Sequence, residues 1–285
     1  MASTITSLFE YGGVTVTESE LEIHLGEALH LVTTEREEID KKLKAFDRFA
    51  VGVSRISAGS EIGPTVRNAI HNGNQEPLSV ATQSIPDNDT RIQKVRSLFA
   101  KTVRPHSVED IEQPEPLLVT IREEFSEEIA LALAPSTNQQ FTENLKSAIL
   151  SSVDQCQSKL KAMDKGLTAE KRNLEKAISL SQSLNEWLVS EWKFAEREGF
   201  DALKDQHEQL NEFRDQCEQL AVDRQSTIHT KRNNTLSADL SHSMLVDYLY
   251  QPLPVTYPIL SASMQMIDVC DTQQRTIRMY LTQCM

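Results

Sequence analysis

Hydrophobic residues in the N-terminal part of the chain recur at every seventh position and predict a helix over residues 18–56. The recurring residues are Leu25, Val32, Ile39, Phe46 and Val53. The matching positions four residues after the first four of them hold Leu29, Arg36, Leu43 and Ala50. A seam kept over about four heptads is typical of a coiled coil. An amphipathic helix packed on a bundle has similar spacing and remains the alternative.

The segment 57–89 interrupts this pattern. It is rich in Gly, Pro, Asn, Ser and Gln and shows no sustained period, which is typical of a flexible linker. We therefore predict four parts. They are a disordered or short arm at 1–17, an N-terminal coiled-coil helix at 18–56, a flexible linker at 57–89 and a helical domain at 90–285.

Helical spacing returns near residue 90. It predicts helices over 91–104 and 116–133, and then a long helix that begins at Ser136 or Thr137 and continues almost to residue 198. Gly199 offers a reversal before a second seamed helix, and two such helices form an antiparallel hairpin. The predicted fold class is all-α: an N-terminal coiled coil, a linker, and a helical bundle with a projecting hairpin whose tip lies near residue 199.

A rigid corner is predicted in YLYQPLPVTYPIL, residues 248–260. The corner residues are Tyr248, Tyr250, Pro252, Pro254, Tyr257 and Pro258. The first two prolines fix φ and lack an amide donor, so a helix cannot continue through them. The third stands at a favoured first position of the next helix. The tyrosines are expected to wedge the corner against the bundle, with their hydroxyls reaching water or backbone. A docking patch for another protein is the alternative.

Four aromatic residues near the predicted tip are candidates for binding another protein: Trp187, Trp192, Phe194 and Phe200. Aromatic side chains exposed at the end of a helical hairpin suit a binding surface. The alternative is that they only seal the turn.

Composition narrows the class of protein. Hydrophobic residues make up 39% of the 285 and charged residues 25%, which favours elongated helices or a disordered portion over one compact domain. The net charge of −13 repels phosphate backbones and argues against binding nucleic acid. The first 25 residues lack the pattern of a signal peptide, and no apolar run is long enough to insert into a membrane. We therefore expect a soluble, cytoplasmic protein.

Chemistry-bearing motifs are missing from the sequence. The four cysteines form no C-x-x-C pair, and the phosphate-binding, dinucleotide-binding, nucleophile-elbow and zinc-protease motifs do not occur. Glu27 and His30 have the spacing of one half of a di-iron site, but no second Glu-x-x-His accompanies them. We predict no catalytic residues, no metal site and no cofactor.

Several segments resemble a family of uncharacterised helical proteins from halophilic archaea, which carry a domain of unknown function. The similar segments are LYQPLPVTYPIL, with its PVTYP motif near the C-terminus, KVRSLFAKTVRPHSVEDIEQPEPLLVTIREEFSEEIALAL, CEQLAVDRQSTIH and EREEIDKKLKAFDRFAVGV. The resemblance supports a helical fold and implies no activity or cofactor.

Three functional hypotheses follow. The leading one is a non-enzymatic coiled-coil scaffold or protein-interaction module, which binds a protein partner or itself as a homo-oligomer. The second is a regulatory or ligand-sensing bundle that holds a small molecule or metal. The third is an enzyme whose site lies beside Tyr248, Tyr250 and Tyr257.

Overall fold

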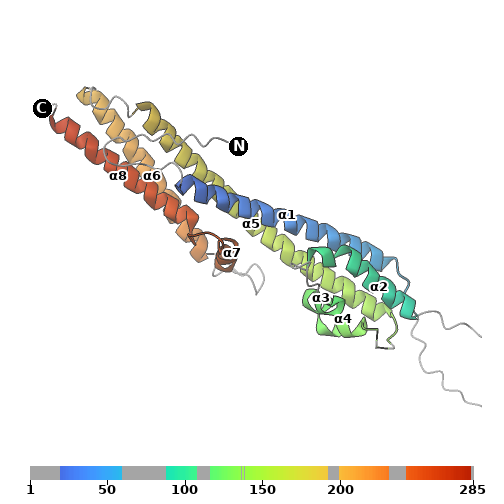
Figure 1. Cartoon of the computed structure of the whole chain (residues 1–285). Helices are drawn as coiled ribbons and strands as arrows, with labels where there is room; N and C mark the ends of the chain where they lie inside the picture. The colour runs from blue at the N-terminus through green and yellow to red at the C-terminus, as the bar shows by residue number, and fades with distance from the viewer. Residues whose placement is uncertain are drawn as a thin grey trace, which may run out of the picture. The chain divides into compact units, whose positions relative to one another are not determined.

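The chain is all-α, as the hydrophobic pattern predicts. The computed structural model describes residues 20–59, 88–107, 116–135, 137, 139–191, 199–230 and 242–283. Within these ranges the only β-type pairing is a single bridge between Gly59 and Thr142. The helices are α1 (Glu20–Ser54), α2 (Asn88–Thr102), η1 (Arg104–His106, a 3-10 helix), α3 (Leu117–Glu124), α4 (Glu127–Ala132), α5 (Glu143–Glu191), α6 (Phe200–Thr230), α7 (His242–Leu249) and α8 (Pro258–Gln283) (Figure 1).

The chain divides into two compact units. Unit 1 consists of Met1–Arg36 and Ala162–Met285, and unit 2 consists of Glu37–Lys161. The division falls within α1 and within α5, so both long helices contribute residues to each unit. The arm predicted at 1–17 and residues 60–87 of the predicted linker lie outside the described residues. The domain boundaries proposed from the sequence therefore stay a prediction.

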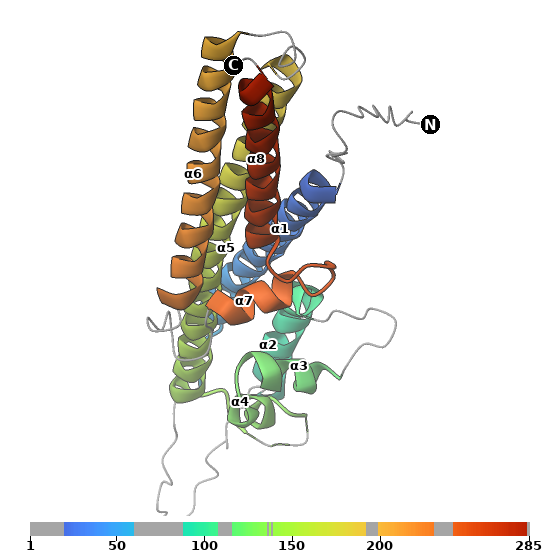
Figure 2. The ribbon, with the colours of Figure 1, turned by 90° about the vertical axis from the view of Figure 1, so that its left-hand side faces the viewer.

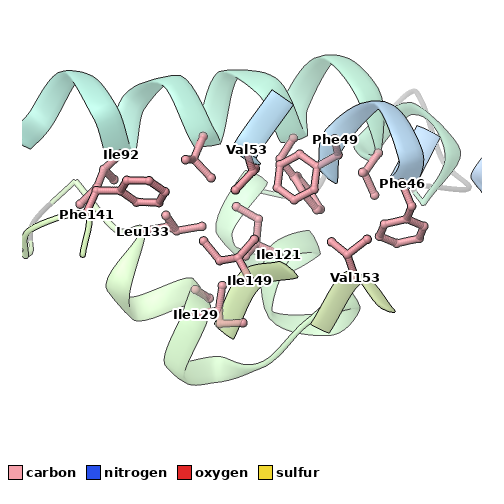
Figure 3. Close-up of a cluster of buried hydrophobic side chains, with 14 residues drawn as sticks. Phe46, Phe49, Val53, Ile92, Ile121, Ile129, Leu133, Phe141, Ile149 and Val153 are labelled. Atoms are coloured by element: carbon pink, nitrogen blue, oxygen red, sulfur yellow. The ribbon is translucent and has the colours of Figure 1, made fainter. Parts of the chain in front are cut away.

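Unit 2 has a core of aromatic and branched side chains contributed by α1 to α5. Phe49 contacts Phe99 edge-on, with ring centroids 5.6 Å apart, and stacks on Phe125 at 5.8 Å. Figure 3 shows Phe46, Phe49 and Val53 of α1 facing Ile149 and Val153 of α5. Aromatic pairs in these geometries add to the stability gained from burying their surface.

The segment 116–133 is broken into two helices, where the sequence predicted one. α3 ends at Glu124, and Ser126 begins α4 by accepting a hydrogen bond from the amide of Ile129 at 3.3 Å. A serine side chain satisfies an otherwise unpaired amide at a helix start, so it favours a new helix over continuation of the old one.

The long helix α5 begins later than the predicted start at Ser136 or Thr137. Thr142 is the capping residue, since its hydroxyl accepts a hydrogen bond from the amide of Leu145 at 3.2 Å. Thr137 instead donates its hydroxyl to the carbonyl oxygens of Leu131 and Ala134, beside the end of α4. From Glu143 the helix runs unbroken through Gly166 to Glu191.

Three helices of unit 1 pack in alternating directions. Glu170 of α5 contacts Arg224 of α6, whereas Trp187, further along α5, contacts Phe213, which lies earlier in α6. α5 and α6 are therefore antiparallel.

The same logic orients α8 against α6. His207 accepts a hydrogen bond from Arg278 at 3.1 Å, while Arg214, later in α6, pairs with Asp271, earlier in α8, at 3.6 Å. The end of α5, the start of α6 and the end of α8 therefore lie together, as Figure 1 and Figure 2 show.

One series of heptad positions of α1 is buried within the chain. Leu25, Val32, Ile39, Phe46 and Val53 are all buried, with exposed fractions of at most 4%. None of the described helices combines the length and the apolar character needed to cross a membrane.

Candidate functional site

The predicted corner lies between α7 and α8. Pro258 is the first residue of α8, the position that the sequence assigns to it. Before it the chain makes a turn in which the amide of Leu253 donates to the carbonyl of Tyr250 at 2.9 Å. Pro252 and Pro254 are exposed on this turn, where a missing amide donor costs nothing.

Tyr250 anchors the corner in a buried charged network. Its hydroxyl donates to Oε1 of Glu170 at 2.5 Å. Two nitrogens of Arg224 donate hydrogen bonds to the same carboxylate, Nη1 to Oε2 at 2.6 Å and Nη2 to Oε1 at 2.7 Å. The exposed fractions are 0% for Glu170, 2% for Arg224 and 1% for Tyr250. We call these three residues the buried triad.

The triad's electrostatics favour a protonated tyrosine. Burial raises the pKa of Tyr250 far above its ordinary value, and the negative charge of Glu170 raises that pKa further. Glu170 remains the acceptor of the two-pronged contact with the guanidinium, which is the strongest geometry available to an arginine–carboxylate pair. Within the described residues, Nε of Arg224 is buried and has no hydrogen-bond partner.

The triad is a structural element rather than a reactive one. Its oxygens and nitrogens are shielded from solvent, so a dissolved substrate has no access to them. The hydrogen bonds connect α5, α6 and the residue that follows α7. The arrangement therefore fixes how these segments of unit 1 pack.

α7 approaches α5 closely beside the triad. A Cβ added to Gly166 would lie 3.2 Å from Cδ2 of Leu245, so the bare glycine leaves room for this leucine. Gly166 and Glu170 are four residues apart and face the same side of α5. These two positions of α5 therefore contact α7, through Leu245, and the corner, through Tyr250.

The other corner tyrosines do not share this environment. Tyr248 and Tyr257 are exposed, unlike Tyr250. The hydroxyl of Tyr250 meets a carboxylate, where the sequence led us to expect water or backbone. Of the three corner tyrosines, Tyr250 is the one that is buried and bonded to Glu170.

Sequence reasoning missed Glu170 and Arg224, although a signal was present. Glu170 lies between Leu167 and Leu174, at the spacing of a buried seam position. Arg224 follows Cys217 by seven residues, again at a seam position. A charged residue at a core position on each of two adjacent seams is the pattern that indicates a buried ion pair.

Two of the four candidate binding aromatics, Trp187 and Phe200, are described by the structure, near the end of α5 and at the start of α6. Trp187 is half-buried and packs on Phe213, with ring centroids 5.9 Å apart. Phe200 is exposed. Trp192 and Phe194 lie outside the described residues.

Two further exposed apolar side chains accompany Phe200. Val189 is close to the end of α5. Met279 is close to the end of α8, next to Arg278, which contacts His207 near the start of α6. The exposed fractions are 50% for Val189, 47% for Phe200 and 59% for Met279. We call these three residues the end patch.

The described cysteines are unreactive in character. Burial raises the pKa of Cys217 to about 11 and that of Cys270 to about 12. Burial also raises the pKa of Cys156, whose thiol donates to the carbonyl of Glu124. Since the thiolate is the nucleophile and the metal ligand, these thiols act as packing groups at neutral pH.

Metal-binding clusters are not found in the part of the chain that the structure describes: no three side chains of His, Cys, Asp or Glu come together there. Glu27, half of the Glu-x-x-His spacing seen in the sequence, is 3.5 Å from His24 on the preceding turn.

The chain belongs to the family DUF7260, a domain of unknown function, whose model matches residues 23–274. That match includes the buried triad and most of both units. Neither the curated proteins nor the solved structures yielded a match.

Proposed function

We propose that this member of the DUF7260 family is a non-enzymatic helical scaffold that binds another protein, or a second copy of itself, through the end patch. The carrying observation is that Val189, Phe200 and Met279 expose about half of their surface at one end of antiparallel helices. Large apolar side chains exposed at the end of a helical hairpin suit a protein-binding surface.

The accessibility of the charged groups supports a non-enzymatic role. In the buried triad of unit 1, the carboxylate of Glu170 is already bound by Arg224 and Tyr250. A general acid, base or nucleophile must reach its substrate. These residues serve packing instead.

The proposal does not use the heptads of α1 as the association surface. Leu25, Val32, Ile39, Phe46 and Val53 are buried within the chain itself, so this series of apolar positions is not available to a second coil. The end patch is the alternative surface within unit 1. Two further expectations remain part of this proposal: an origin in halophilic archaea, which the sequence resemblance implies, and a cytoplasmic location, which the lack of a signal-peptide pattern in the first 25 residues favours.

The test compares two variants that remove equally exposed apolar groups. Phe200→Ser with Met279→Ser removes two of the three apolar side chains of the end patch, whereas Val222→Ser changes a 57% exposed valine in a later part of α6. Sedimentation equilibrium of the full chain measures self-association, and capture from a lysate of the source organism measures binding to other proteins.

The expected result is that the double variant weakens association, or the capture of a specific protein, by at least about tenfold. Val222→Ser should behave as the wild type does. Two results together would contradict the proposal. The wild-type chain would be monomeric, and the wild type and the double variant would capture the same proteins. Circular dichroism of both variants confirms that each remains helical.

A further inference from the structure

A groove of about 480 Å³ lies in unit 2 along the outer side of α2. Its lining residues on α2 include Lys94, Ser97, Leu98 and Lys101. Ile56, just after α1, also lines it. The volume lies within the range of small-molecule sites, about 300–1,000 Å³. The buried triad and the end patch belong to the other unit.

The floor of the groove is apolar. Leu98 and Ile56 are both partly buried and pack against the core of unit 2. Leu98 packs directly against Gly52 of α1, which has no side chain. A Cβ added to Gly52 would lie only 2.0 Å from Cδ2 of Leu98. The missing side chain on α1 thus sets the depth at which Leu98 forms the floor.

Two lysines, Lys94 and Lys101, also line the groove. Lys94 and Lys101 are seven residues apart on one face of α2, which corresponds to about 10 Å along the helix. Both are exposed. Among the described residues neither forms an ion pair, whereas Lys41, Lys42 and Lys44 of the same unit each pair with a carboxylate.

This combination selects the chemistry of a ligand. An apolar floor favours a hydrocarbon chain, because removing it from water releases free energy in proportion to the area covered. Cationic groups at the edge favour an anionic head group, which can remain partly hydrated beside them. A neutral apolar molecule would use only the floor, and a small hydrophilic anion only the lysines.

We propose that the α2 groove binds a medium-chain carboxylate, with its head group at Lys94 or Lys101 and its hydrocarbon chain over Ile56 and Leu98. The proposal is independent of the end patch and would give unit 2 a ligand-binding site of its own. It would narrow the ligand-sensing hypothesis to one class of molecule and one face of α2.

The test is isothermal titration calorimetry of the full chain with octanoate, 1-octanol and acetate. Octanoate carries both features, octanol lacks the charge, and acetate lacks the chain. We expect saturable binding of octanoate, weaker binding of octanol and no measurable binding of acetate. The double variant Lys94→Gln with Lys101→Gln should weaken octanoate binding about fivefold and leave octanol unchanged.

The matched control removes the same charge elsewhere in unit 2. Lys159 and Lys161 are also exposed, and the variant Lys159→Gln with Lys161→Gln should leave octanoate binding within about twofold of the wild type. Ile56→Ala tests the floor and should weaken octanoate and octanol alike. The proposal is overturned if octanoate gives no saturable heat, or if both lysine pairs reduce its binding equally.

Discussion

The hydroxyl of Tyr250 donates a hydrogen bond of 2.5 Å to Glu170, a residue 80 positions earlier in the chain. Both side chains are almost fully buried. The contact attaches the turn after α7 to the middle of α5, and the proline segment that follows begins from this fixed point. A residue of the turn, rather than the prolines alone, therefore determines where the chain enters α8.

Replacing Tyr250 by Phe should destabilise the protein. The change keeps the ring but removes the donor, so the buried carboxylate of Glu170 loses one of its hydrogen bonds. We expect a loss of about 1–3 kcal/mol in the free energy of unfolding, measured by urea denaturation. Tyr257→Phe, at an exposed position, should change that free energy by less than about 0.5 kcal/mol. Equal effects of the two changes would contradict the assignment.

Separating the ion pair should cost more than replacing it as a whole. Glu170→Gln leaves the guanidinium of Arg224 buried without its carboxylate, and we expect a loss of about 3–5 kcal/mol. The combined change of Glu170→Met, Arg224→Met and Tyr250→Phe removes every member and should cost less than Glu170→Gln alone, and less than the sum of its own three changes made singly. Strictly additive losses in urea denaturation would show that the triad is not a unit.

High pH should weaken the wild type more than Tyr250→Phe. Burial and the charge of Glu170 raise the pKa of Tyr250 above the ordinary value of 10.0. A group whose pKa is raised by folding contributes stability that is complete below its unfolded pKa and declines as the pH rises above it.

The advantage of the wild type over Tyr250→Phe should therefore stay constant up to about pH 9 and shrink above about pH 10, by up to about 1.4 kcal/mol per pH unit. Urea denaturation of both proteins at matched pH measures the difference and cancels the titration of the lysines. A constant difference across this range would mean that the hydroxyl ionises freely in the folded state.

Two glycines of α1 should respond oppositely to alanine. Gly26 is exposed, and a Cβ there meets nothing within 4 Å, so Gly26→Ala should stabilise the protein by about 1 kcal/mol through helix propensity. Gly52→Ala places a Cβ 2.0 Å from Leu98, and the movement that this forces should cancel or reverse the gain. Thermal denaturation compares them, and an equal rise in Tm for both would be contrary to the packing described.

Periodicity predicted much of the helical arrangement because seams and breakers are local properties. Pro258 was placed at the start of a helix from the residues around it, and the structure agrees. The break at Ser126 was missed because Ile121, Phe125 and Ile129 keep helical spacing across it. A capping serine inside a continuous apolar pattern is recognised only when its hydrogen bond is known.

The triad was harder to predict for a different reason. A search for hydrophobic spacing considers only apolar residues. It therefore does not detect Glu170 and Arg224, which are charged residues at core positions. Their pairing depends on which helices become neighbours, and this information is not contained in either segment alone. Tyr250 was singled out from the corner motif, yet its acceptor lay in a helix 80 residues away.

The sequence separation within the triad has a consequence for how the protein is made. Glu170 and Arg224 are synthesised before Tyr250, so any pair of α5 and α6 that forms in the meantime has the Glu170–Arg224 ion pair without the tyrosine hydroxyl. That half-made assembly is less stable than the finished one, because a buried carboxylate still lacks a donor. Completion of unit 1 thus waits for the last quarter of the chain, and ribosome-bound fragments that stop short of Tyr250 should be digested by protease faster than those that include it.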